Sequence, residues 1–130
     1  MTIPTIGQCM TPDPIRISRD LTLEDAAARM FEHGFRHLLV YTGDTLEGIV
    51  SDRDVALLGG LKAFDRGRVP IHEMMTRDPL TCPASTPLDE ALDLLCDRKI
   101  SSLVVEEGGE VVGIFTTIDA MRELRDRLRA

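Results

Sequence analysis

The chain has 130 residues, a length that suits one globular core and requires neither disulfides nor a metal for folding. It is 43% hydrophobic and 28% charged, and its formal net charge of −7, with no Trp and one Tyr, argues against nucleic acid as a partner. No apolar run is long enough to span a bilayer and no secretory signal is visible, so we expect no membrane contact and a cytoplasmic location.

The first half of the chain predicts a strand, a helix, two strands and a second helix. An extended segment at 15–17 follows Asp-Pro, a pair that disfavours helix. A helix start at Thr22 and a stop at Gly34 enclose an amphipathic segment. Strands at 37–41 and 46–51 flank Gly43-Asp44, a favourable hairpin turn, and a helix begins near Asp52. The predicted buried helix face consists of Leu23, Ala26, Ala27, Met30 and Phe31.

The second half repeats this order at an offset of 65 residues. Residues 6–56 align with 71–121 without a gap, and 13 of the 51 positions are identical. The second unit therefore predicts strands at 80–82, 102–106 and 110–116, with helices that begin after Thr86 and near Thr117. Its first helix is predicted to bury Leu88, Ala91, Leu92, Leu95 and Cys96.

The repeat predicts the domain organisation. We expect a first repeat at 6–56, a linker at 57–70, and a second repeat at 71–121 whose last helix continues to about 129. A unit of about 50 residues buries its own faces poorly, so the two repeats should pack together as one module. The predicted fold class is α/β, with two pseudosymmetric β-α-β-β-α repeats.

Two motifs occur once in each repeat. Met-Thr-x-Asp-Pro occupies 10–14 and 75–79, and Gly-h-h-Ser/Thr-x-x-Asp, where h is apolar, occupies 48–54 and 113–119. In these motifs and their order, the unit resembles a CBS domain, named after cystathionine β-synthase. The chain resembles a stand-alone tandem pair of them, a Bateman module, over about residues 5–125.

The resemblance implies a regulatory ligand-binding module without catalytic activity. Such pairs bind AMP, ADP, ATP or sometimes S-adenosylmethionine in clefts between the repeats, and they often form dimers. The Asp of the second motif bonds the ribose hydroxyls, the Ser or Thr holds ribose or phosphate, and apolar residues of the other repeat surround the base. We therefore expect an adenine nucleotide as regulatory ligand, a homodimer and an unidentified effector protein.

Carried over residue by residue, the resemblance implies two clefts. Cleft A is expected to consist of Met10, Ile15, Phe35, Arg36, His37, Thr116 and Asp119. Cleft B is expected to consist of Ser51, Arg53, Asp54, Met75, Leu80, Ile100, Ser101 and Ser102.

The charges of the two predicted clefts differ. Carboxylates accept hydrogen bonds from vicinal hydroxyls, whereas phosphates require cations or helix N-termini. Cleft A offers Arg36 and His37 where cleft B offers Ser101 and Ser102. We therefore expect cleft A to bind charged nucleotides more strongly.

Each candidate site residue also has a structural interpretation. Ser51-x-x-Asp54 and Thr116-x-x-Asp119 have the form of helix capping boxes, a role that is compatible with ligand binding. Met10 and Met75 could fill a core. The chain could thus be a structural dimerisation module with empty clefts. It could also bind S-adenosylmethionine or another nucleoside, because the aspartates would recognise ribose rather than phosphate.

Catalytic and metal chemistry have little support in the sequence. We find no nucleophile–base arrangement, and hence no candidate catalytic residue or catalytic cofactor. His33 and His37 have the spacing of a metal pair, but Gly34 interrupts the helix between them, so no metal site is predicted. The three cysteines form no CxxC pair. They are predicted to be reduced, small core residues.

Overall fold

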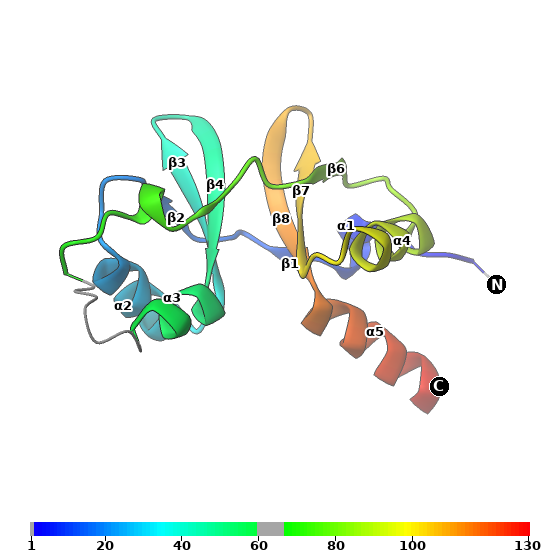
Figure 1. Ribbon diagram of the computed structural model, residues 1–130. Helices are drawn as coiled ribbons and strands as arrows, with labels where there is room; N and C mark the ends of the chain where they lie inside the picture. Colours follow the sequence, from blue (N-terminus) through cyan, green and yellow to red (C-terminus); the bar gives the residue numbers. More distant parts are fainter. Residues whose placement is uncertain (1, 60–66) are drawn as a thin grey trace. The chain divides into compact units, whose positions relative to one another are not determined.

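The computed structural model describes residues 2–59 and 67–130 and divides into two compact units. Unit 1 comprises Met1–Pro14 and Leu80–Ala130, and unit 2 comprises Ile15–Pro79 (Figure 1). Each unit therefore takes its lead-in segment from the other sequence repeat. The repeat and linker bounds predicted from the sequence describe similarity along the chain, and as domain bounds they stay a prediction.

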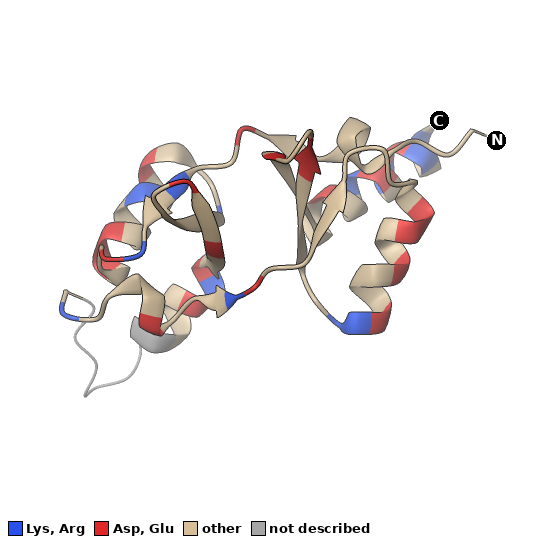
Figure 2. Cartoon of the chain, turned by 90° about the horizontal axis from the view of Figure 1, so that it is seen from above, with Lys and Arg blue, Asp and Glu red and all other residues tan. Residues whose placement is uncertain are grey.

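Unit 2 is built on a four-stranded sheet in the order β2-β3-β4-β5. Strands β2 and β3 are parallel, whereas β3–β4 and β4–β5 are antiparallel. Basic and acidic residues alternate along its helices (Figure 2). Its elements are β2 (Arg16–Ser18), α2 (Leu23–His33), β3 (His37–Thr42), β4 (Thr45–Ser51), α3 (Asp52–Gly59), the 3₁₀ helix η1 (Ile71–Glu73) and β5 (Thr76–Arg77).

Unit 1 has the same plan, with a sheet in the order β1-β8-β7-β6. The predicted strand–helix–strand–strand–helix order is confirmed in both repeats. No helix in the described parts of the chain is long and apolar enough to cross a membrane. The elements are α1 (Ile6–Cys9), β1 (Thr11–Pro12), β6 (Thr81–Pro83), α4 (Leu88–Arg98), β7 (Ser102–Glu107), β8 (Glu110–Thr116) and α5 (Thr117–Arg129).

Each Met-Thr-x-Asp-Pro motif adds a short strand to a sheet and then redirects the chain. Thr11 pairs with Ile114 in β8, and Thr76 pairs with Ile49 in β4, both antiparallel. The following aspartate of each motif has a positive φ, 52° in the first and 50° in the second. Aspartate tolerates this left-handed conformation better than most residues. The prolines that follow are the last residues before the chain passes into the other unit.

Glycines in β4 and β8 make room for these lead-in strands. A Cβ atom on Gly48 would lie 2.6 Å from the Met75 sulfur and 2.7 Å from the Thr76 carbonyl oxygen. A Cβ atom on Gly113 would lie 2.8 Å from the Thr11 carbonyl oxygen and would also collide with the Met10 sulfur. Close approach of backbone and methionine therefore explains why glycine opens the second motif. It also confirms the packing role of both methionines.

We expect Gly113→Ala to destabilise the protein by about 1–3 kcal/mol, because the added methyl group must displace a backbone carbonyl as well as a flexible side chain. Gly48→Ala should behave alike. Urea unfolding measures both effects, with Glu110→Ala on the exposed start of β8 as a control that should stay within about 0.5 kcal/mol of the parent. Unchanged stability of Gly113→Ala would contradict the close approach.

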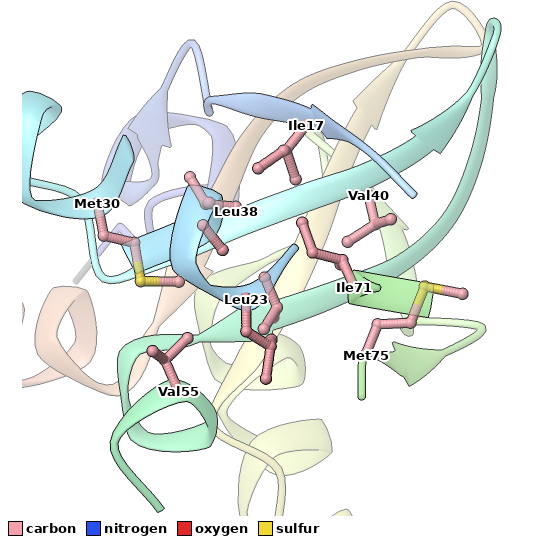
Figure 3. Packing of buried hydrophobic residues seen from close by; sticks show 10 residues of the cluster. Ile17, Leu23, Met30, Leu38, Val40, Val55, Ile71 and Met75 are labelled. Carbon is pink, nitrogen blue, oxygen red and sulfur yellow. The ribbon is translucent and has the colours of Figure 1, made fainter. Parts of the chain in front are cut away.

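The core of unit 2 includes residues that come after the first repeat. Ile71 and Met75 pack with Leu23, Leu38 and Val40 beneath the sheet (Figure 3). In unit 1, Ile6 of α1 is likewise fully buried among residues of the second repeat. The remaining buried members of that core are Cys82, Leu88, Ala91, Leu95, Leu103, Val105 and Phe115.

The predicted burial is wrong for two residues of the helix faces. Phe31 is 93% exposed, and Cys96 is exposed as well. Each directly follows the last buried residue of its helix, Met30 in α2 and Leu95 in α4. Successive side chains on a helix point about 100° apart. Phe31 and Cys96 therefore lie outside the buried face of each helix, which is narrower than predicted.

The cysteines differ in exposure and acidity. Cys82 is buried and Cys9 is partly buried, in agreement with the prediction, whereas Cys96 is exposed. Burial raises the pKa of the Cys82 thiol. Burial and the nearby Glu123 carboxylate raise the pKa of Cys9 to about 11.

Thiol titration of the native protein at pH 7.5 should therefore give one fast reaction per chain, at Cys96. The other two thiols are shielded and hold their protons, and the thiolate is the reactive form. Cys96→Ser should remove the fast phase, while the denatured parent should show all three thiols. A fast phase that survives in Cys96→Ser would refute this assignment.

The two equivalent helices α2 and α4 end differently. Gly34 follows α2 with φ 72°, and Lys99 occupies the matching left-handed position after α4 with φ 53°. Glycine adopts this conformation without the steric cost that a Cβ atom brings.

Lys99→Gly should accordingly stabilise the protein by about 0.5–1 kcal/mol, as measured by the thermal unfolding midpoint. The reciprocal variant Gly34→Lys should lower the midpoint. Equal effects of the same sign in the two variants would show that the left-handed cap does not control stability here.

Candidate ligand-binding site

The second motif of each repeat places a serine or threonine and an aspartate at a strand–helix junction. In unit 1, the Thr116 backbone N–H donates to Asp119 Oδ2 at 2.9 Å, and the Thr116 hydroxyl donates to the same oxygen at 3.2 Å. In return, the Asp119 N–H donates to the Thr116 hydroxyl oxygen at 3.4 Å. The carboxylate therefore lies at the N-terminus of α5, where the helix dipole favours negative charge.

The junction in unit 2 has the same reciprocal bonds. The Ser51 N–H donates to Asp54 Oδ2 at 2.9 Å, and the Asp54 N–H donates to the Ser51 hydroxyl oxygen at 3.2 Å. Both predicted capping boxes are thus confirmed. The capping role leaves the other carboxylate oxygen, Oδ1, available for further contacts.

A third box of the same form lies at the start of α2, outside the predicted site. The Thr22 N–H donates to Asp25 Oδ2 at 2.9 Å, and bonds from the Thr22 backbone and hydroxyl lower the pKa of the Asp25 carboxyl. A Ser/Thr-x-x-Asp box therefore does not by itself mark a ligand site. The surroundings of the carboxylate must distinguish a ligand site from a simple cap.

Asp119 has a closed environment. It is 4% exposed, and its second oxygen, Oδ1, accepts a hydrogen bond from the Thr11 hydroxyl at 2.9 Å. A guanidinium nitrogen of Arg122 lies 3.5 Å from the same oxygen. Thr11 is not among the predicted site residues, although it belongs to the Met-Thr-x-Asp-Pro motif, and its hydroxyl is the feature by which it could have been predicted.

Asp54 has a more open environment. It is partly buried, and in residues 2–59 and 67–130 no hydrogen bond or ion pair reaches its Oδ1. The residue that corresponds to Thr11 is Thr76, which is exposed. The residue that corresponds to Arg122 is Leu57, also exposed, whose side chain has no charge.

The residues predicted for cleft A are distributed over both units. Met10, Thr116 and Asp119 lie together in unit 1, whereas the others lie in unit 2. In unit 2, Ile15 packs against the core, Phe35 and His37 are partly buried, and Arg36 is exposed. Whether the two halves meet around a ligand stays a prediction.

Cleft B is divided in the same way. Unit 2 holds Ser51, Arg53, Asp54 and Met75. Arg53 is exposed on the first turn of α3, and Met75 is buried in the core of its unit. The residues in unit 1 are Leu80 and Ile100, both packed against its core, followed by Ser101 and Ser102.

Other features lie away from these junctions. His33 ends α2 and His37 begins β3, with the left-handed Gly34 between them. Over the described residues, no group of three or more His, Cys, Asp or Glu side chains could hold a metal ion. A groove of about 450 Å³ in unit 1, lined by Cys82, Glu90, Leu94 and neighbouring residues, contains none of the predicted site residues.

Two matched α/β repeats, each with a capped strand–helix junction, define a tandem-repeat module. The family model for the CBS domain matches residues 6–58 and again 71–126. The chain belongs to the CBS domain family and contains two copies of the domain.

The chain is similar in sequence or structure to several known proteins. An inosine-5'-monophosphate dehydrogenase of Korarchaeum cryptofilum is 38% identical over 109 residues, which is 82% of this chain but only 21% of the enzyme. The structure of CBSX2 in complex with AMP has 28% identity and a TM-score of 0.76, with 95% of this chain and 97% of that one covered. The CBS domain pair of MJ0100, crystallised with 5'-methylthioadenosine and S-adenosyl-L-methionine, has 24% identity and a TM-score of 0.84, at coverages of 97% and 99%.

Proposed function

We propose that the chain is a regulatory module that binds an adenine nucleotide between its two CBS repeats and has no catalytic activity. The observation that carries this proposal is the pair of equivalent junctions, each with an aspartate carboxylate held at a helix N-terminus by the reciprocal bonds of its box. Preorganised carboxylates of this kind suit the vicinal hydroxyls of a ribose.

The neighbouring residues supply the other parts of a nucleotide site. The N-termini of α3 and α5 favour a phosphate group, and Arg36 or Arg53 would pair with its charge. Ile15 and Phe35, or Leu80 and Ile100 in the second cleft, would form an apolar slot for adenine. The likeness to CBSX2, whose structure contains AMP, supports an adenine nucleotide over other ligands.

The regulatory part of the proposal rests on the extent of the similarity. The chain spans about a fifth of the dehydrogenase that it matches, so the activity of that enzyme does not transfer to it. Ligand binding would shift the equilibrium between alternative packings of the two repeats. This shift would change a surface to which an effector protein binds. A homodimer and a cytoplasmic location belong to the same proposal.

A structural module is the second candidate, and one observation favours it. The Thr22–Asp25 box caps α2 at an exposed position outside the predicted clefts, which supports a structural use of the same arrangement at the other two junctions. In that case the clefts would be empty and the pair would serve dimerisation. A nucleoside such as S-adenosylmethionine is a further alternative within the binding proposal.

A thermal-shift panel of AMP, ADP, ATP, S-adenosylmethionine and GTP tests the proposal. A ligand at 100 times its dissociation constant should add about 2.7 kcal/mol of stability, which raises the unfolding midpoint by several degrees. We expect adenine ligands to produce this shift and GTP to produce less.

The matched variants Asp54→Ala and Asp25→Ala control for the loss of a helix cap, because each removes the carboxylate of one box. Both should lower the midpoint of the free protein, but only Asp54→Ala should reduce the ligand-induced shift. Flat responses to every ligand, with protein shown by mass spectrometry to carry no bound nucleotide, would favour the structural module.

A further inference from the structure

The two equivalent aspartates differ in one contact that the sequence repeat does not anticipate. The Thr11 hydroxyl donates to Asp119 Oδ1 at 2.9 Å across 108 positions of sequence. At the corresponding place in unit 2, the Thr76 hydroxyl makes no such bond to Asp54, in the part of the chain that the structure describes. The offset of 65 residues makes these two pairs directly comparable.

The contact occupies the oxygen that a ligand would need. Oδ2 of Asp119 is engaged by the Thr116 N–H and hydroxyl, so Oδ1 is the oxygen left for an outside donor. The Thr11 hydroxyl is chemically the same kind of donor as a ribose hydroxyl, and it binds at an ordinary hydrogen-bond distance. With Arg122 3.5 Å away, the buried carboxylate has its partners within its own unit.

We propose that Thr11 is a built-in competitor for ligand hydroxyls at Asp119, so that the first ligand molecule binds at Asp54. This inference rests on the proposed function and deepens it. A ligand at Asp119 must first displace the Thr11 hydroxyl, and an exchange of one hydroxyl for another gains little free energy. A ligand at Asp54 would bind Oδ1, an oxygen that has no hydrogen-bond partner among the residues that the structure describes.

The two clefts would then fill in the opposite order to that expected from side-chain charge. Arg36 and His37 favour cleft A for charged nucleotides, but that cleft depends on Asp119. Arg36 and His37 would add affinity for a phosphate there, but displacement of the Thr11 hydroxyl from Asp119 subtracts from the net affinity of that cleft. The structure therefore makes cleft B the first site to fill.

The displacement also has a structural consequence within unit 1. Thr11 belongs to β1, which pairs with β8, and Asp119 belongs to α5. The hydroxyl bond thus ties the lead-in strand to the first turn of the last helix. A ligand that binds Asp119 Oδ1 would break the Thr11–Asp119 hydrogen bond. Ligand binding at Asp119 is therefore coupled to the position of β1.

Isothermal titration with AMP at a single salt concentration tests the proposal through four threonine variants. Thr11→Ala removes the competing hydroxyl, and Thr11→Ser keeps it. Thr76→Ala and Thr76→Ser are the matched controls, because Thr76 is the equivalent residue without the bond. The parent should bind one AMP per chain at low concentration, and Asp54→Ala should weaken that binding at least tenfold.

Thr11→Ala should bind the second AMP at least tenfold more tightly than the parent, whereas Thr11→Ser and both Thr76 variants should match the parent. Two equal sites in the parent, or unchanged second-site binding in Thr11→Ala with a normal circular dichroism spectrum, would overturn the inference. So would parent binding that survives Asp54→Ala.

The failure of the underlying function has a different signature. If no variant and no parent protein binds AMP, ADP, ATP or S-adenosylmethionine, then the nucleotide proposal itself is refuted, and the inference with it. If the parent binds but the Thr11 and Thr76 variants behave alike, the nucleotide proposal stands and only the role of Thr11 is refuted.

Discussion

The structure depends on the pairing of each lead-in strand with the last strand of the other sequence repeat. Strands β1 and β5 are only two residues long, yet each completes a sheet and carries a methionine against a glycine. The approach of backbone to backbone at Gly48 and Gly113 leaves no room for a Cβ atom. Because each unit borrows this strand, neither sequence repeat contains its whole spatial unit.

The same pairing shapes the candidate site. It brings the threonine of the first motif beside the helix that carries the aspartate of the second motif. In unit 1 this produces the Thr11–Asp119 bond, whereas in unit 2 the corresponding threonine is exposed. Within residues 2–59 and 67–130, Oδ1 of Asp54 has no hydrogen-bond partner. Two junctions with the same capping bonds therefore differ in whether the second carboxylate oxygen can accept a hydrogen bond from a ligand.

Much of the fold was predictable because its main elements carry strong local signals. The amphipathic period of α2 and α4, the glycine turns of both hairpins and the offset of 65 residues gave the correct order of elements. Strands β1 and β5 escaped prediction because two residues are too few to show alternation. Phe31 was misplaced because helical period alone does not say how wide the buried face is.

For the candidate site, the sequence by itself determined the residue types, the capping boxes and the membership of a family of paired repeats. These are properties of short segments, in which spacing along the chain sets spacing in space. Only the tertiary structure decided which carboxylate is closed. The hydroxyl that donates to Asp119 belongs to Thr11, 108 positions away in the sequence. Its direction depends on the packing of a two-residue strand, which no local sequence pattern indicates.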